Sequence, residues 1–270
     1  MSTIILYHAN CPDGLGSAYA AYEHYGNTAT YQPVSYSDPF NAEDYRDKDV
    51  YVLDFSFKRK QYLQLLEVAK SVIVLDHHKS AHEEIGDLVK IDQTKSGARL
   101  AWEYFHPNTD VPLIILRIED RDLWLYKYTD TKAVNAWMSI YTQGLTPEAF
   151  SDLIDTTSYD KIVSLGTPVV NYIEAQAKAV SSGYWLTVLS GHVVPVVNCP
   201  PGLTSVVGEI LAKEHTFSVS YSDKYPLRTV SLRSIGKFDV SAIAKQYGGG
   251  GHRNAAGFTI NMNETFDLFK

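Results

Sequence analysis

Hydrophobic residues in the first half of the chain form short, uninterrupted runs that are separated by longer stretches with helical spacing. The runs predict buried β-strands, at 4–7, 29–34, 50–53 and 71–75. The intervening stretches predict helices, at 14–25, 60–70, 96–105 and 112–118. Strands that alternate with helices are typical of an α/β fold, in which right-handed crossovers place helices on both faces of a parallel sheet. We therefore expect such a sheet in the N-terminal part of the chain.

The pattern changes in the second half. Residues 133–182 have helical spacing, and 159–182 predicts one long helix that ends at Gly183. Beyond it the pattern predicts strands and two helices, with strands at 184–189, 193–198, 216–222, 228–234 and 257–261 and helices at 203–213 and 239–246. This mixture indicates a smaller α+β domain. We expect a first domain at 1–158, a connecting helix at 159–183 and a second domain at 184–270.

The composition adds limits to this picture. A chain of 270 residues with 45% hydrophobic and 20% charged residues is typical of a globular protein with a sizeable core. Cys11 and Cys199 are the two cysteines, which argues against a disulfide framework and a structural zinc site. The N-terminus lacks the features of a signal peptide, and no apolar run is long enough to span a bilayer. We expect a cytoplasmic protein with no membrane partner.

The distribution of charge bears on the kind of ligand. The formal net charge of −7 argues against sequence-blind binding of long nucleic acid, which needs an excess of basic residues. The segment 228–253 is the exception, because it holds five basic residues and one acidic residue. A local basic segment in an acidic protein favours a small phosphorylated ligand over a duplex.

Charged and imidazole side chains directly follow three of the predicted strands. They are His8, Asp54 and the triplet Asp76-His77-His78. In an open parallel sheet, ligands gather at the carboxyl ends of the strands. Imidazole and carboxylate groups that meet there favour a divalent metal site, in which Asp76 would orient one imidazole. Taken alone, Asp54 could equally cap the helix that follows it.

Two further acidic segments are ambiguous by themselves. His8, Asn10 and Asp13 lie on a turn that Pro12 and Gly14 impose, so the turn could aim ligand atoms at one point or simply cap a helix. The charged segment 119–122 ends an apolar helix. It could be a solvated cap, or it could return an aspartate to the edge of the sheet as a ligand.

The second domain contains a run of glycines, Gly248-Gly-Gly-Gly251, followed by His252. Glycines lose much conformational entropy on ordering, so a folded chain holds such a run where backbone must approach a ligand or another segment closely. Its amides could bind a phosphate, although the Lys of a P-loop is missing. Arg233, at the end of a predicted strand, is a candidate partner for that phosphate. The alternative is a flexible hairpin.

Taken together and in order, these motifs resemble those of the DHH phosphoesterase superfamily, in the two-domain form that carries a DHHA1 domain. The matching segments are His8-Ala-Asn-Cys-Pro-Asp13-Gly, Asp54, Asp76-His77-His78, Asp120, and Gly248-Gly-Gly-Gly-His252 with Ala255-Ala-Gly257-Phe258. The resemblance implies a metal-dependent hydrolase of phosphoric esters or anhydrides, similar to nanoRNases and cyclic-dinucleotide phosphodiesterases. The resemblance implies two Mn²⁺ ions, with Mg²⁺ as a possible substitute, and the mixed carboxylate and imidazole ligands agree with Mn²⁺.

The resemblance also implies roles for residues. His8 and Asp54, together with Asn10, would bind the first metal. The second metal would be bound by Asp13, Asp54, His77 and Asp120, so that Asp54 bridges the two, and Asp122 stays open as an alternative to Asp120. His78, with Asp76, would serve as the catalytic contact to a leaving or non-bridging oxygen. The substrate-binding residues would be Arg233, Ser234, Gly249, Gly250, Gly251 and His252.

One departure from the family pattern matters for function. Asn10 stands where members commonly have an aspartate, and a neutral amide is expected to weaken the first metal site. The main hypothesis is a Mn²⁺-dependent phosphodiesterase for short oligonucleotides, linear or cyclic dinucleotides, or 3′,5′-bisphosphate nucleotides such as pAp. A single-strand-specific exonuclease is the enzymatic alternative. A nucleotide-binding protein that sequesters its ligand with little turnover is the alternative of another class. We expect no long duplex partner, and a monomer or homodimer.

Overall fold

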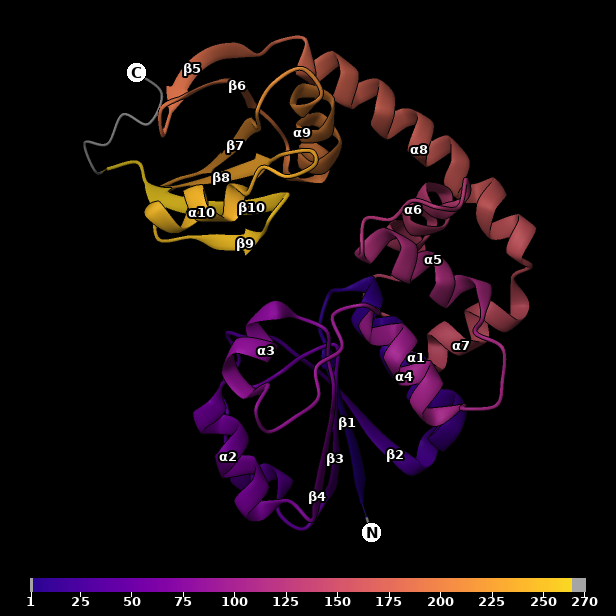
Figure 1. Ribbon diagram of the computed structural model, residues 1–270. Helices are drawn as coiled ribbons and strands as arrows, with labels where there is room; N and C mark the ends of the chain where they lie inside the picture. Colours follow the sequence, from indigo (N-terminus) through magenta and orange to yellow (C-terminus); the bar gives the residue numbers. More distant parts are fainter. Residues whose placement is uncertain (1, 264–270) are drawn as a thin grey trace. The chain divides into compact units, whose positions relative to one another are not determined.

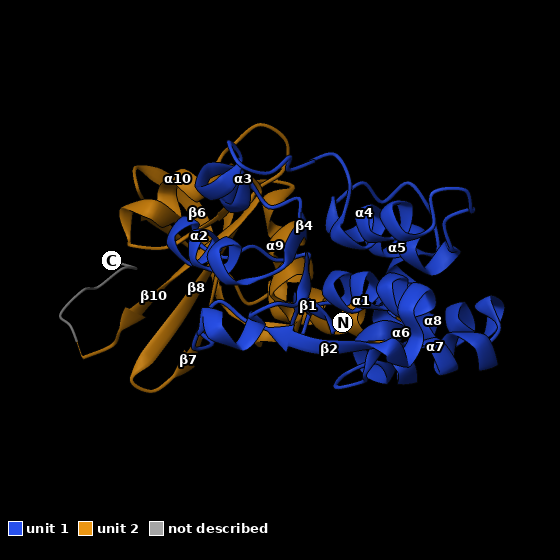
Figure 2. Ribbon diagram, turned by 90° about the horizontal axis from the view of Figure 1, so that it is seen from below, with its two compact units in different colours: residues 1–170 blue, residues 171–270 orange. Residues whose placement is uncertain are grey.

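The structure is a computed structural model that describes residues 2–263, apart from the side chain of His252. It divides into two compact units, Met1–Val170 and Asn171–Lys270, which Figure 2 shows in blue and orange. The long helix α8 (Tyr159–Ser181) contains the point of division. Within residues 2–263 no helix is both long enough and apolar enough to cross a membrane.

The first unit is built on a four-stranded sheet of order β2-β1-β3-β4, in which every neighbouring pair is parallel. Its strands are β1 (Thr3–His8), β2 (Ala29–Val34), β3 (Asp49–Leu53) and β4 (Ser71–Leu75). Its helices are α1 (Pro12–Tyr25), α2 (Arg59–Val68), α3 (Lys79–Ile85), α4 (Gly97–Phe105), α5 (Leu113–Asp122), α6 (Thr131–Tyr141) and α7 (Pro147–Thr156). The predicted parallel sheet is confirmed, and α3 is a helix that the hydrophobic pattern did not predict.

Alternating side chains of β1 explain why helices cover both faces of this sheet. Ile5 and Tyr7 point into a core shared with α1 and α4, while Ile4 and Leu6 point into a core shared with α2 and α3. Figure 1 shows α1 and α4 on one side of the strands and α2 and α3 on the other. Both faces are therefore buried, and only the ends of the strands remain for polar groups.

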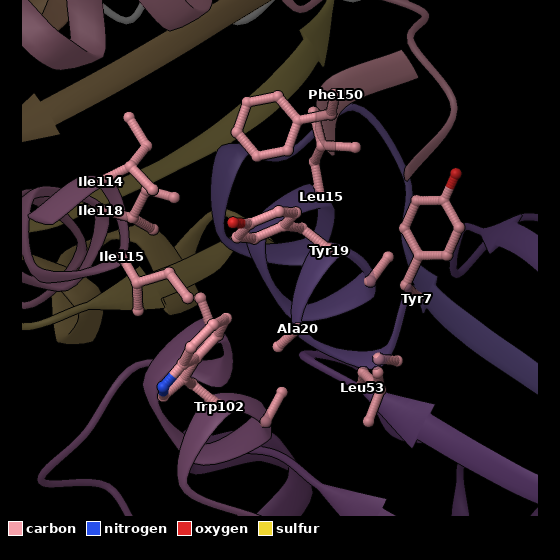
Figure 3. Packing of buried hydrophobic residues seen from close by; sticks show 14 of the residues in the cluster. Tyr7, Leu15, Tyr19, Ala20, Leu53, Trp102, Ile114, Ile115, Ile118 and Phe150 are labelled. Atoms are coloured by element: carbon pink, nitrogen blue, oxygen red, sulfur yellow. The ribbon is translucent and has the colours of Figure 1, made fainter. Parts of the chain in front are cut away.

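The larger core cluster extends from the sheet into the helices α5 to α8. Figure 3 shows Tyr19 between Trp102 and Phe150, with the isoleucines of α5 at their side. The ring of Tyr19 stacks on Trp102 at a centroid distance of 6.0 Å and meets Phe150 edge-on at 5.4 Å. This packing fixes α5, whose last residues lead to the site described below.

The second unit contains a six-stranded sheet of order β5-β6-β7-β8-β10-β9, in which only β6 and β7 pair in parallel. The strands are β5 (Trp185–Leu189), β6 (His192–Asn198), β7 (Ser218–Lys224), β8 (Leu227–Arg233), β9 (Gly250–His252) and β10 (Ala255–Asn261). The helices are α9 (Thr204–Ala212) and α10 (Val240–Gln246). The expected α+β architecture is confirmed. The strand β9 was not predicted, because a run of glycines carries no hydrophobic pattern.

Candidate metal centre

The ends of three neighbouring strands bring the candidate ligands of the first unit together. Tyr7 of β1 pairs with Leu53 of β3, and Leu53 pairs with Leu75 of β4. The next residue on each strand is therefore at the same level of the sheet: His8, Asp54 and Asp76. Parallel pairing in this register places an imidazole and two carboxylates side by side, as expected from the strand ends in the sequence.

Asp54 is the centre of this arrangement. It is 1% exposed, and its backbone adopts φ 52°, a left-handed conformation that is uncommon outside glycine and recurs at functional sites. Its two oxygens face different histidines: Oδ2 lies 3.5 Å from Nδ1 of His8, and Oδ1 lies 3.3 Å from Nε2 of His77. Among the described residues, neither oxygen and neither of these nitrogens has a hydrogen-bond partner.

Such orphaned buried atoms test whether a metal would fit. Burying a carboxylate without donors costs several kcal/mol, and native proteins rarely leave such groups unsatisfied. Atoms that share an ion at a distance of about 2.1 Å lie roughly 3 Å apart. The separations of 3.3 and 3.5 Å between the Asp54 oxygens and the two imidazoles suit that arrangement. The residues present therefore fit a divalent cation.

A second group of ligand atoms adjoins Asp54. Nε2 of His77 lies 3.5 Å from Oδ2 of Asp13 and 3.4 Å from Oδ2 of Asp122. Asp13 is fixed by α4, because the N–H groups of Gly97 and Ala98 donate to its two oxygens at 2.7 and 2.9 Å. The group therefore combines one imidazole with carboxylates from α1 and α5.

Glycine at position 97 is required for this contact between α4 and the ligands. A Cβ atom added there would lie 2.5 Å from Cβ of Asp54. Gly97 was not among the predicted site residues. No signal in the sequence marks it, because the segments that contain positions 54 and 97 meet only in the folded unit.

The structure separates the two aspartates that end α5. Asp122 belongs to the group with Asp13 and His77. Asp120 is buried, and its carboxylate accepts hydrogen bonds from Thr131 Oγ1 and from the N–H groups of Lys127 and Tyr128. Residues two apart on a helix point about 200° away from each other, so only one of the two can face the site. Of the two candidates that the sequence offered, Asp122 therefore lies beside Asp13 and His77, and Asp120 is engaged by the loop that follows the helix.

In the triplet Asp76-His77-His78, the His77 imidazole belongs to the candidate ligand group, whereas the His78 imidazole is held by Asp76. Nδ1 of His78 donates to Oδ1 of Asp76 at 2.7 Å, and Ser56 Oγ donates to the other Asp76 oxygen. The N–H groups of His77 and His78 also donate to Asp76, so the carboxylate fixes the backbone as well as the ring. Asp76 therefore orients His78 and leaves its Nε2 as the nitrogen that can meet a substrate. Ser56 was not singled out in the sequence.

The electrostatics of the cluster follow from burial and crowding. Burial and the charges of Asp54 and Asp122 raise the pKa of Asp13 well above its usual range. Burial opposes protonation of His77, but the surrounding carboxylates of Asp54, Asp13 and Asp122 outweigh it and raise its pKa to about 9. Burial likewise tends to raise the pKa of Asp54, yet His77 and His8 hold it below the usual range. Perturbed pKa values of this kind, on carboxylates crowded around one imidazole, are typical of functional sites.

The turn after β1 places two further residues. Asn10 is exposed and adopts φ 55°. Cys11 follows it, and its sulfur lies within 4.8 Å of ligand atoms of both His8 and Asp54. Asn10 was among the predicted ligands and Cys11 was not, although the cysteine lies inside the matched motif. Its place within this motif was the signal in the sequence that could have identified Cys11 as a candidate ligand.

Three of the candidate substrate residues of the second unit, Arg233, Gly249 and Gly250, line a groove of about 550 Å³, whereas Ser234 and Gly251 are not among its lining residues. It is bordered by Thr229–Ser231, Arg233, Gly248–Gly250 and Ala255–Thr259. Gly249 must be glycine here, since an added Cβ would lie 2.1 Å from the Gly257 carbonyl oxygen. At Gly250 an added Cβ would meet nothing within 4 Å. The glycine run is therefore part of an ordered sheet that forms a wall of the groove.

The remaining predicted residues differ in their surroundings. Arg233 donates to Ser205 Oγ at 3.2 Å, and its stem packs where Gly208 of α9 leaves space. The Ser234 side chain is buried, donates to the Phe238 carbonyl and accepts from Asn254, so it supports the neighbouring loop. The side chain of His252 lies outside the described part of the chain.

Comparisons with known proteins agree with this architecture. Residues 202–270 match the family model of the DHHA1 domain. An uncharacterized protein of Acanthamoeba polyphaga mimivirus is 29% identical over 285 residues, which cover 96% of this chain and 67% of that protein. The DHH domain of PF0399, a member of a family of ribosomal proteins, has a TM-score of 0.68 at 15% identity and covers 98% of this chain and 84% of that one. The pGpG-specific phosphodiesterase PggH of Vibrio cholerae has a TM-score of 0.57 at 15% identity, over 97% and 94% of the two chains.

The family match and the shared fold describe the two units of the chain. The chain has a parallel-sheet unit with the fold of a DHH domain, followed by a unit that contains a DHHA1 domain. The match at residues 202–270 and the fold of the first unit agree with the resemblance to the DHH plus DHHA1 form of the DHH phosphoesterase superfamily that the sequence motifs indicated.

Proposed function

We propose that this protein is a two-metal phosphodiesterase that hydrolyses small nucleotide substrates with Mn²⁺ as its preferred cation. The single observation that carries the proposal is the buried Asp54 carboxylate. Its two oxygens lack hydrogen-bond partners among the described residues, and each faces a different histidine of a different ligand group. A carboxylate in that position suits a bridge between two cations.

The ligand groups assign residues to each cation. His8 and Asp54 would hold the first, and Asp13, Asp54, His77 and Asp122 would hold the second. Bound there, the two cations would supply a nucleophile at neutral pH and neutralise charge on the phosphate oxygens. Carboxylate and imidazole donors together favour Mn²⁺, whereas Mg²⁺ prefers oxygen donors alone.

His78 is the group that would act on the substrate. Asp76 accepts the hydrogen bond from Nδ1, so the ring keeps one orientation and presents Nε2. Burial lowers the pKa of His78, but Asp76 and Asp54 outweigh that effect and raise it. A protonated Nε2–H would donate to a phosphate oxygen or to the leaving group.

The groove of the second unit supports a nucleotide-sized ligand. Arg233 supplies a guanidinium group at one side, and Gly250 leaves the backbone accessible at another. A guanidinium can contact a phosphate through two hydrogen bonds. Near the ligands of the first unit, Trp124 and Tyr126 are exposed and meet edge-on at 5.5 Å, two and four residues beyond Asp122. Exposed aromatic rings of this kind can stack on nucleobases.

The choice of small nucleotides rests on two further arguments. PggH, whose fold this chain shares, is specific for pGpG. The net charge of −7 also weighs against tight binding of long strands. A single-strand-specific exonuclease is the enzymatic alternative, and a nucleotide-sequestering protein is the non-enzymatic one.

Product analysis tests the proposal. The purified protein is incubated with linear and cyclic dinucleotides, pAp and a long single strand, each with Mn²⁺, Mg²⁺ or a chelator, beside an Asp54→Asn variant. Metal-dependent release of mononucleotides from the short substrates by the wild type alone is the expected result. Preferential degradation of the long strand would favour the exonuclease. Tight retention of one nucleotide without turnover under all metals would favour the sequestering protein and refute the phosphodiesterase.

A further inference from the structure

The turn between β1 and α1 brings a thiol to the first group of metal ligands. The Cys11 sulfur, a ring nitrogen of His8 and a carboxylate oxygen of Asp54 all lie within 4.8 Å of one another. Both oxygens of Asp54 and Nδ1 of His8 are buried without a hydrogen-bond partner among the described residues. The unsatisfied atoms of His8 and Asp54 therefore indicate a cation site independently of the cysteine.

The backbone explains why the sulfur is held there. Cys11 precedes the first residue of α1 in an extended conformation, φ −123° and ψ 131°, and its side chain makes no capping hydrogen bond to the helix. Gly14 allows α1 to begin directly against β1, since a Cβ added there would lie 2.1 Å from the His8 carbonyl oxygen. The thiol therefore lies near His8 and Asp54, close to the backbone of Asp13 and Gly14 at the start of α1, but without the capping hydrogen bond that Ser, Asp or Asn would make at this position.

We propose that Cys11 is the third protein ligand of the first metal site and gives that site a preference for borderline-soft cations such as Zn²⁺, Fe²⁺ or Co²⁺. The inference rests on the proposed two-metal centre and names the ligand that distinguishes its two sites. On binding, the thiol releases its proton to solvent and the thiolate coordinates the cation.

The donor sets of the two sites then differ in kind. The first combines nitrogen, oxygen and sulfur from His8, Asp54 and Cys11. The second combines one imidazole with the carboxylates of Asp13, Asp54 and Asp122. Thiolate ligands select softer metals, whereas carboxylates suit Mn²⁺ and Mg²⁺. The pair of sites is thus suited to two different metals.

The thiolate also accounts for the neutral residue at position 10. Asn10 is exposed on the turn, and its amide carries no charge. A thiolate at the next residue restores a negative ligand beside the first cation. The first site can then bind a divalent cation tightly without a carboxylate at position 10.

Cobalt spectroscopy of the full chain tests the assignment without any substrate. Sulfur bound to Co²⁺ gives an intense near-ultraviolet charge-transfer band, which oxygen and nitrogen ligands do not give. Metal-free wild type, Cys11→Ser and Cys199→Ser are titrated with Co²⁺. Cys199 is buried in the second unit, so its variant is the matched control. We expect the band in the wild type and Cys199→Ser, its loss in Cys11→Ser, and weakening of Zn²⁺ binding by about tenfold or more in Cys11→Ser.

Absence of the band from the wild type, or its persistence in Cys11→Ser, would overturn the assignment. If Cys11→Ser fails to fold by circular dichroism, alkylation of the wild type decides instead. Zn²⁺ should protect Cys11 from iodoacetamide, as measured by mass spectrometry, and equal labelling with and without Zn²⁺ would refute the proposal. A Cys11-dependent band in a protein that hydrolyses none of the nucleotides would retain the ligand and reject the proposed activity. Hydrolysis of the nucleotides by a protein without the band would support the proposed activity and reject Cys11 as a ligand.

Discussion

Asp122 and His77 meet at the end of α5, where Oδ2 of the aspartate lies 3.4 Å from Nε2 of the imidazole. Asp120, two residues earlier, instead accepts the N–H groups of Lys127 and Tyr128 and so closes the loop that follows the helix. One aspartate faces the candidate metal ligands, and the other holds the segment that follows α5. The two have different consequences when they are replaced.

Asp122→Asn should lower metal affinity and hydrolytic activity about 100-fold or more, since the second cation loses a charged ligand. The melting temperature of the metal-free protein should not fall, because the change also removes a charge that crowds Asp13 and Asp54. Asp120→Ala should lower the free energy of unfolding by about 2 kcal/mol, because buried N–H and hydroxyl donors lose a charged acceptor. Calorimetric metal titration and chemical denaturation separate the two effects. Loss of metal affinity in Asp120→Ala, with none in Asp122→Asn, would instead identify Asp120 as the ligand.

Removal of metal should make the stability of the protein sensitive to alkaline pH. In the metal-free fold the pKa of His77 is raised from 6.5 to about 9, and those of Asp13 and Asp122 are also raised. A group whose folded pKa is raised stabilises the fold below its unfolded pKa, and this stabilisation is lost as pH rises through the folded value. The melting temperature in chelator should therefore fall between pH 6.5 and 9. His77→Gln serves as the control and should show a smaller fall.

Saturating Mn²⁺ should reverse that loss, because a bound cation replaces the protons. Binding at a hundred times the dissociation constant stabilises a folded protein by about 2.7 kcal/mol. The melting temperature should rise on addition of Mn²⁺, and the rise should be larger at pH 9 than at pH 6.5. An Asp54→Asn variant should show little response. If Mn²⁺ did not change the melting temperature of the wild type at either pH, the proposed metal centre would be wrong.

Asp76→Asn should lower kcat about 10- to 100-fold while KM and metal stoichiometry change little. The amide can no longer accept hydrogen bonds as a charged group from His78 Nδ1 and Ser56, so the ring loses its fixed orientation. Ser56→Ala removes one donor and leaves the imidazole contact, so its effect on kcat should be smaller. Steady-state kinetics with metal analysis of each variant makes the comparison. Loss of bound metal in Asp76→Asn would instead make Asp76 a ligand.

Arg233→Ala should raise KM for nucleotide substrates about tenfold or more, since a hydrogen bond to a charged group contributes about 1.5–3 kcal/mol. A generic aryl phosphodiester, which does not need the groove, should be hydrolysed at nearly the wild-type rate. Arg228→Ala is the matched control: it is on the same strand, is paired with Asp223 at 2.7 Å and is not among the residues that line the groove. Equal losses on both substrates would mean that Arg233 acts in chemistry or folding.

Much of the fold could be predicted from the sequence because it follows from local patterns. Apolar runs marked the strands, and the helix predicted at 96–105 begins at Ser96, whose side chain caps α4 by accepting from the Arg99 N–H. The segments without such a pattern were missed: α3, whose short sequence is largely polar, and β9, which is built of glycines. A strand with no side chains to alternate has no periodicity to detect.

The sequence by itself determined which ligand types follow each strand, since His8, Asp54 and His77 are fixed by their positions after apolar runs. Only the tertiary structure placed Asp122 rather than Asp120 beside Asp13 and His77, and brought Cys11 and Gly97 to Asp54. The physical reason is that a side chain's direction at a helix end or in a turn depends on how that element packs. Which residue follows the end of a strand can be predicted from the local pattern, whereas contacts between segments distant in the chain arise only when helices such as α4 and α5 dock on the sheet.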